Sequence, residues 1–262
     1  MTLTTEKMPP KTVPQALGVL ALQGSFAEHI AALESVTTST GDKLPVVAVR
    51  TPADLARCRA LIVPGGESTT ISLLIRKSGL YEPLKEFVRL AKTGTGQRSL
   101  WGTCAGMILL AKEIDGPTSE GWDGLDGMDV RVARNQYGRQ LQSFSHPVSL
   151  PFLPPGDPLL ATFIRAPVLH SLLPSTSPTA SSPPVEVLAR LPASLVPPPH
   201  RAQAATGGRA EVGPEADAVM YRQGDLLACS WHPELNKGDA RVHDWWVREM
   251  VLHEGEERRK GT

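Results

Sequence analysis

A cysteine stands between two glycines in the stretch Gly102-Thr103-Cys104-Ala105-Gly106. The spacing Gly-x-Cys-x-Gly indicates a backbone turn too tight for side chains at the flanking positions, as in a nucleophile elbow between a strand and a helix. At a helix start, the positive end of the helix dipole favours the thiolate, which is the nucleophilic form of cysteine. The alternative is a small buried apolar cysteine, the usual state of a free thiol. The flanking glycines favour the nucleophile.

A thiolate nucleophile needs a base, and the base needs a group that orients it. The segment "SWHPEL" supplies His232 and Glu234, two positions apart at the end of a predicted strand over 226–231. Alternate positions of an extended chain face the same side, and Pro233 biases His232 toward an extended backbone. The carboxylate can then accept from one imidazole nitrogen while the other faces the sulfur. The remaining histidines lack a carboxylate at this spacing and are interpreted as surface residues: His29, His146, His170, His200, His243 and His253.

Composition narrows the class of protein. The 262 residues contain 27 Lys+Arg and 27 Asp+Glu, so the formal net charge is zero, which argues against a nucleic-acid partner held by bulk charge. The other two cysteines, Cys58 and Cys229, have no adjacent glycine and fit buried apolar positions. Three cysteines do not make a disulfide framework, and they indicate a reducing compartment. With no signal-peptide core and no apolar run long enough to span a bilayer, we expect a cytoplasmic protein without a membrane partner.

The elements around the cysteine alternate between strand and helix. Short apolar runs predict strands over 16–24, 44–50 and 60–68 and a strand and turn over 99–106, and helical spacing predicts helices over 25–36, 51–58, 69–94 and 107–114. This alternation predicts an α/β fold: a three-layer, flavodoxin-like sheet, mostly parallel, with antiparallel additions. The strands predicted within 128–152, 159–169 and 218–235 either extend this sheet or fold over one end of it. Ser25 is a candidate N-cap. A last helix over 241–254 is expected to pack Trp245, Val247 and Met250 against the sheet.

The carboxyl ends of parallel strands meet at one edge of a sheet, which is where ligands bind. We therefore expect three turns to converge there, namely 23–24, 64–68 and 102–104. The backbone N–H groups of Gly66 and Ala105 are candidates for an oxyanion hole. We expect one domain over 16–253 between an extension (1–15) and a tail (254–262). Insertions rich in Pro and Ser near 173–184 and 197–214 flank a predicted strand over 185–191.

The motifs "PGGES", "GTCAG" and "HPE" occur in an order similar to that of class I glutamine amidotransferases, whose triad is Cys-His-Glu. More narrowly, "GVLALQGSFAEHIAALE", "LIVPGGESTTISLL", "WGTCAGMILLA", "RNQYGRQLQSF", "FIRAP" and "SWHPEL" together resemble the glutaminase subunit of pyridoxal 5′-phosphate synthase. The resemblance covers most of residues 16–249. The Pro/Ser-rich insertions and the N-terminal extension exceed the compact bacterial members and suggest a eukaryotic, fungal version.

The resemblance implies hydrolysis of L-glutamine to glutamate and ammonia, with the ammonia passing to a separate synthase subunit. It implies that Cys104 is the nucleophile, His232 the general base and acid, and Glu234 its orienter. It further implies no cofactor and no metal. Contacts to glutamine are expected from the following residues: Gly66, Glu67, Ser68, Arg134, Ile164 and Arg165.

Alternatives remain at this stage. Arg134 also fits an exposed strand arginine, and Glu67 a charge at a helix N-terminus. The rival functions are a glutaminase serving a different synthase, a free-standing γ-glutamyl hydrolase, a cysteine peptidase on a related scaffold and a partner-binding pseudoenzyme. Intact Cys104, His232 and Glu234 argue against the pseudoenzyme.

Overall fold

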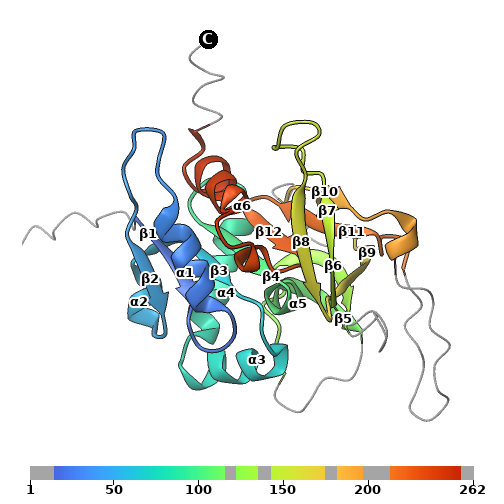
Figure 1. Ribbon diagram of the computed structural model, residues 1–262. Coiled ribbons are helices and arrows are strands. Elements are labelled where there is room, and N and C mark those ends of the chain that lie inside the picture. The colour runs from blue at the N-terminus through green and yellow to red at the C-terminus, as the bar shows by residue number, and fades with distance from the viewer. Residues whose placement is uncertain (1–14, 116–121, 135–142, 175–181, 197–212, 255–262) are drawn as a thin grey trace, which may run out of the picture.

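The computed structural model describes residues 15–115, 122–134, 143–174, 182–196 and 213–254. Figure 1 shows a central sheet with helices on both sides and further strands gathered at one end. Seven strands form the central sheet in the order β10-β11-β12-β4-β3-β1-β2. Their bounds are β1 Ala16–Leu20, β2 Val46–Val49, β3 Cys58–Val63, β4 Ser99–Thr103, β10 Glu186–Arg190, β11 Ala218–Gln223 and β12 Leu226–Cys229.

The strand pairing confirms the predicted fold class. β2, β1, β3, β4 and β12 are parallel neighbours in that order, which is the flavodoxin-like arrangement. β11 and β10 extend the sheet with antiparallel pairing. The predicted strand over 185–191 is confirmed as β10, whereas most of the insertions that flank it, and residues 1–14 and 255–262, lie outside the described residues.

The helices bury two separate cores, one on each face of the sheet. Their bounds are α1 Phe26–Ser35, α2 Pro52–Ala56, α3 Ser68–Lys77, α4 Tyr81–Lys92, α5 Ala105–Leu110 and α6 Arg241–Trp245, which continues as the π-helix η3 Trp246–Val251. Buried residues of α3, α4 and α5 share one core, and those of α1, α6 and η3 share the other. The central strands are buried on both faces, which explains their uninterrupted apolar sequences.

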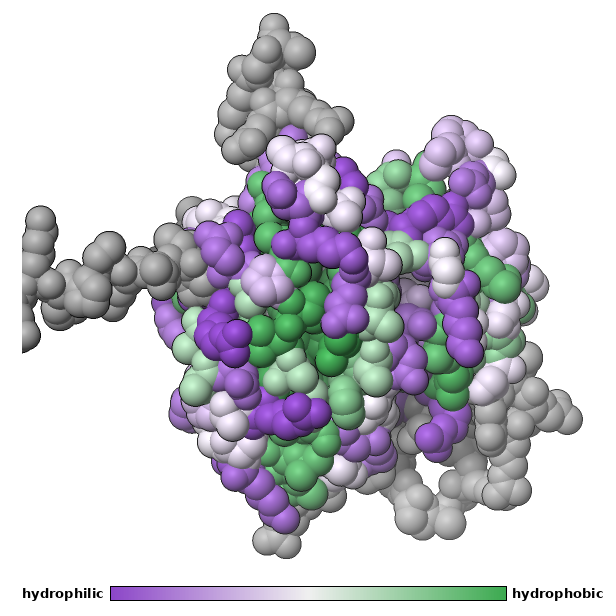
Figure 2. Space-filling model, turned by 60° about the vertical axis from the view of Figure 1, so that its left-hand side comes forward, coloured by the Kyte–Doolittle hydropathy of each residue, from purple (hydrophilic) through white to green (hydrophobic). Residues whose placement is uncertain are grey.

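The remaining strands form two small sheets beside the central one. β5 (Ala111–Asp115), β6 (Met128–Ala133) and β9 (Val168–Leu172) form one, and β7 (Ser143–Val148) pairs antiparallel with β8 (Leu159–Ile164) in the other. Figure 2 brings the α1 and β2 side forward, where apolar side chains gather in the middle of the face and polar ones surround them. No helix among the described ranges is long and apolar enough to cross a bilayer.

Two of the predicted helices have other boundaries in the structure. The helix predicted over 69–94 is two helices, separated where Gly79 adopts φ +72°. The helix predicted over 107–114 ends at Leu110, because the carbonyls of Leu109 and Leu110 accept N–H groups of a later loop, and the chain continues as β5. In the last helix Val247 and Met250 are buried, as predicted, and Trp245 is half-buried, packs against the same core and stacks on the Phe152 ring. Trp246 is fully buried.

Candidate active site

Cys104 occupies the strained turn that the glycine spacing predicts. It lies between β4 and α5 with φ 48° and ψ −103°, a conformation that L residues rarely adopt. A Cβ atom at Gly102 would lie 2.5 Å from the carbonyl oxygen of Gly106, and one at Gly106 would lie 2.1 Å from the carbonyl oxygen of Val63. Both glycines are therefore required by close backbone approach, and the predicted turn is confirmed.

His232 and Glu234 meet beside this turn. Nδ1 of His232 lies 2.7 Å from Oε1 of Glu234, and both residues are buried. The backbone N–H of His232 donates to the carbonyl of Thr162 in β8, which fixes the residue after β12. A Cβ atom at Gly65 would lie 2.3 Å from Cε1 of His232, so the loop after β3 closes directly over the ring.

The reason predicted for this contact was wrong, although the contact forms. β12 ends at Cys229, before the predicted end at position 231. Pro233 begins a short 3₁₀ turn, η2 (Pro233–Leu235), instead of continuing an extended chain. The turn folds Glu234 back onto the His232 ring, so it is a tight turn and not the period-2 geometry of a strand that joins the two side chains.

His232 and Glu234 each stabilise the charged form of the other. Burial lowers the pKa of His232, but the neighbouring Cys104 and the hydrogen bond to Glu234 outweigh burial and raise that pKa to about 10. Burial raises the pKa of Glu234, but the hydrogen bond from His232 and the charge of nearby His29 lower it to about 2. At neutral pH the site therefore holds an imidazolium between a carboxylate and the sulfur. Cys104 is among the groups that raise this pKa of His232, so its sulfur lies near the imidazole.

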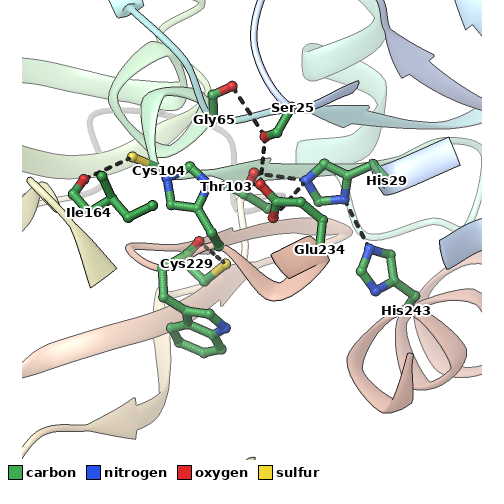
Figure 3. A network of polar contacts seen from close by, with 11 residues as sticks. Ser25, His29, Gly65, Thr103, Cys104, Ile164, Cys229, Glu234 and His243 are labelled. Carbon is green, nitrogen blue, oxygen red and sulfur yellow. Dashed lines mark hydrogen bonds and ion pairs between the residues drawn. The ribbon is translucent and has the colours of Figure 1, made fainter. Parts of the chain in front are cut away.

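Sequence reasoning missed the network that surrounds Glu234 (Figure 3). The Ser25 hydroxyl donates to Oε1 of Glu234 at 2.5 Å, and Nε2 of His29 lies 3.2 Å from Oε2. The same Nε2 lies 3.1 Å from the Thr103 hydroxyl, and Nδ1 of His29 lies 2.9 Å from Nε2 of His243. The interpretation of His29 and His243 as surface residues was wrong, since both are fully buried.

A signal for part of this network existed in the sequence. Ser25 and His29 are four positions apart at the start of a helix, so both lie on one face. Ser25 makes no side-chain N-cap bond, because its hydroxyl is directed to Glu234 and to the carbonyl of Gly65. No local pattern indicates that His243 lies behind His29.

A small cavity of about 180 Å³ opens beside the sulfur. It brings together residues that the sequence analysis assigned to glutamine binding and to the oxyanion hole. It is lined by Gly66, Glu67, Ser68, Cys104, Ala105, Ile108, Arg134, Ile164, Arg165 and Pro167. Pockets for drug-sized ligands are larger, about 300–1,000 Å³, so this one suits a single amino acid. A larger cavity of about 570 Å³, beside Phe152 and Trp245, contains none of the predicted site residues.

The backbone at the cavity is strained at two positions. Arg165 adopts φ 43°, and with Cys104 it makes two of the four described non-glycine residues with positive φ. The carbonyl oxygen of Ile164, the residue before it, lies 4.0 Å from the Cys104 sulfur. Strained backbone clusters where a site holds groups in positions that relaxed chains do not supply.

The charged side chains at the cavity have unequal roles. Glu67 is the N-cap of α3, and its carboxylate accepts from the backbone N–H groups of Thr69 and Thr70. Burial raises the pKa of Glu67, but the hydrogen bonds from Thr70 and Thr69 lower it overall. The Arg134 guanidinium lies 5.5 Å from the Trp122 ring. The rest of the "RNQYGRQ" motif, residues 135–140, lies outside the described residues. Arg134 and Arg165 together give the cavity a positive character.

The other two cysteines are buried, as predicted. Burial raises the pKa of Cys58 to about 11 and that of Cys229 well above its usual value, so both stay thiols at neutral pH. Within the described ranges, no group of three or more His, Cys, Asp or Glu side chains is arranged to hold a metal ion.

Comparisons with known proteins cover almost the whole chain. The family model for the SNO glutamine amidotransferase family matches residues 19–252. The chain is 37% identical over 240 residues to pyridoxal 5′-phosphate synthase subunit SNO1 of Saccharomyces cerevisiae, covering 90% of this chain and 93% of that protein. It is 36% identical over 235 residues to subunit PdxT of Pyrococcus furiosus, covering 90% and 98%. A crystal structure of a glutamine amidotransferase superposes with TM-score 0.65 at 36% identity, covering 90% of this chain and 98% of that one.

Proposed function

Because the chain belongs to the SNO glutamine amidotransferase family, we propose that it hydrolyses L-glutamine to L-glutamate and ammonia. The observation that carries the proposal is the strained Cys104, which lies near the hydrogen-bonded His232–Glu234 pair and is open to an amino-acid-sized cavity.

In the first half of the reaction, the Cys104 thiolate attacks the side-chain amide carbon of glutamine. A C–S bond forms, and the carbonyl π electrons move onto oxygen. The N–H groups of Gly66 and Ala105, which line the cavity, are the proposed donors to this oxyanion. The tetrahedral intermediate collapses, the C–N bond breaks and His232 transfers its proton to the departing nitrogen, which leaves as ammonia.

In the second half, neutral His232 takes a proton from water, and the oxygen attacks the γ-glutamyl thioester. The C–S bond then breaks, which releases glutamate and restores the thiolate beside a protonated His232. Glu234 remains ionised throughout, in keeping with its low pKa, and holds the ring by accepting from Nδ1.

The charged groups of the cavity suit the two ends of a free amino acid. Arg134 and Arg165 are proposed to bind the α-carboxylate, because guanidinium groups pair with carboxylates through two parallel N–H bonds. Backbone groups of Glu67, Ser68 and Ile164 are proposed to complete the contacts. The Glu67 carboxylate is already used to cap α3.

We also propose that the ammonia passes to a separate pyridoxal 5′-phosphate synthase subunit, as the names of the relatives suggest. Leu160 and Ile164 of β8 and Leu235 of η2 are large apolar residues that are 55%, 36% and 40% exposed. Exposed apolar side chains beside a site are typical of a surface that a partner covers. Three free cysteines fit a reducing compartment such as the cytoplasm.

The test measures glutamate production by the purified full chain, alone and with a synthase subunit. We expect a low rate alone that rises on addition of the partner, and no turnover in Cys104→Ala or His232→Asn. Cys58→Ala is the matched control. Equal rates with and without the partner would favour a free-standing hydrolase. Residual turnover in Cys104→Ala would show that another group is the nucleophile.

A further inference from the structure

We propose that His29 is a positioning residue, which holds Glu234 through its Nε2–H and is itself held by His243. The inference rests on the proposed function, in which Glu234 orients the catalytic imidazole. It adds a second layer of histidines behind the triad, joining α1 and α6 to the reacting groups.

The contacts form a continuous chain through the interior (Figure 3). Nε2 of His243 lies 2.9 Å from Nδ1 of His29, and Nε2 of His29 lies 3.2 Å from Oε2 of Glu234. Oε2 is buried and accepts no hydrogen bond of ordinary geometry from the described residues, and its close polar contact within the described ranges is that with Nε2 of His29. The other oxygen, Oε1, accepts from Ser25 and His232.

Both outer histidines are neutral at physiological pH. Burial lowers the pKa of His29 to about 4, against the opposing charge of Glu234, and it lowers the pKa of His243 to about 3. Trp101 packs edge-on against both rings, with centroids 5.9 Å from that of His29 and 5.0 Å from that of His243. Each ring therefore carries one proton, and its position determines the direction of every hydrogen bond in the chain.

The groups at the two ends of this series of contacts, Glu234 and His243, determine which ring nitrogens carry the protons. Ionised Glu234 only accepts, so a lone pair on Nε2 of His29 would repel it, and this nitrogen must carry the proton. Nδ1 of His29 is then an acceptor, and His243 must donate through Nε2. Nδ1 of His243 is left with a lone pair, and this buried atom has no hydrogen-bond partner among the described residues.

If each histidine carried its proton on Nδ1 instead, two unfavourable contacts would arise. His29 would present a lone pair to the carboxylate, and His243 would bury an N–H without an acceptor, which native proteins avoid more strongly than an unused lone pair. The donor of His29 also lies 3.1 Å from the hydroxyl of Thr103, the residue before the nucleophile. His29 thus links the orienting carboxylate to the strand that carries Cys104.

Two substitutions of equal polarity separate positioning from packing. The amide nitrogen of glutamine reaches the place of Nε2, whereas that of asparagine reaches only the place of Nδ1. We expect His29→Asn to lower kcat about tenfold to a hundredfold with little change in KM, the effect of removing the donor that faces a buried charged oxygen. His29→Gln should stay within about threefold of the unchanged protein. His146→Asn, on β7 and outside the cavity, is the control.

A spectroscopic measurement tests the same inference without turnover. In the full chain labelled with ¹⁵N-histidine, we expect the neutral ring of His29 and that of His243 each to carry its proton on Nε2, with assignments made from His29→Gln and His243→Gln. A proton on Nδ1 of His29 overturns the inference, and so do equal rates for His29→Asn and His29→Gln. If the protein releases no ammonia, the proposed function fails, and the tautomers still decide whether the chain of histidines exists. The tautomers of the unchanged protein also decide the inference if His29→Asn does not fold.

Discussion

The Ser25 hydroxyl donates a 2.5 Å hydrogen bond to Glu234, although 209 positions separate the two residues in sequence. Ser25 lies in the loop after β1, where it was expected to cap α1, a role worth about 1 kcal/mol of stability. The helix instead begins without a side-chain cap, because the hydroxyl is committed to the carboxylate. The α1 helix therefore lacks the stabilisation of a side-chain cap, and the Ser25 hydroxyl instead holds the carboxylate that orients His232.

The first prediction follows from this bond. In Ser25→Ala, Glu234 keeps its contact with His232 but loses a short donor, so we expect kcat to fall about tenfold or more while KM changes little. Steady-state glutamate release measures both constants. Ser35→Ala is the matched control, because its hydroxyl bonds only to a carbonyl of the same helix. A Ser25→Ala variant with unchanged kcat would show that the bond has no part in orientation.

The second prediction concerns the strained backbone at Cys104. Alanine at this position keeps the strain, whereas glycine adopts positive φ freely. We expect both variants to be inactive, and Cys104→Gly to have a free energy of unfolding about 1–2 kcal/mol higher than that of Cys104→Ala. Denaturant unfolding of the pair measures the difference. Equal stabilities would mean that the φ of 48° stores no strain.

The third prediction tests the close approach of Gly106 to the backbone of Val63. A Cβ atom in Gly106→Ala would lie 2.1 Å from the Val63 carbonyl oxygen, so β3 and α5 must separate. We expect the free energy of unfolding to fall by about 2–3 kcal/mol and glutaminase activity to be lost. Gly156→Ala is the comparison, since its Cβ would meet open space at φ +84° and cost about 1 kcal/mol. Similar losses in the two variants would contradict this account.

The fourth prediction is that the protein is labile in acid. The folded pKa values of His29 and His243, about 4 and 3, lie below the ordinary value of 6.5, so the unfolded chain binds protons more readily. Stability should therefore fall as the pH drops from 6.5 toward 3, by about 3 kcal/mol through His29. Glu234, with a folded pKa of about 2 against 4.5, adds a loss between pH 4.5 and 2.

At alkaline pH, stability is expected to fall as the pH rises. The folded pKa of His232 is raised to about 10, so its contribution is fully present below pH 6.5 and is lost as the pH rises through 10. Chemical unfolding from pH 3 to pH 10 should trace a dome. In His29→Gln the acid limb should be shallower. An acid limb as steep in this variant as in the unchanged protein would exclude His29 as a source.

Much of the fold could be read from local patterns. Alternating apolar runs and helical spacing predicted the parallel sheet, because strands buried on both faces are apolar throughout, as β1, β3 and β4 are. Boundaries such as the end of α5 at Leu110 could not be predicted, since they depend on hydrogen bonds from a loop that follows much later. The 3₁₀ turn that joins His232 to Glu234 was likewise misread as extended chain.

By itself, the sequence determined the residue types that can do the chemistry and the turn that presents the sulfur, because glycine spacing and strand endings are encoded within a few positions. Only the tertiary structure decided the environment of Glu234. Ser25 lies just before α1, His29 in α1 and His243 in α6, at opposite ends of the chain. Ser25 and His29 meet the carboxylate, and His243 meets His29, only when α1 and α6 cover the same face of the sheet. Burial there turns ordinary histidines into neutral hydrogen-bonding groups, and burial is a property of the folded packing.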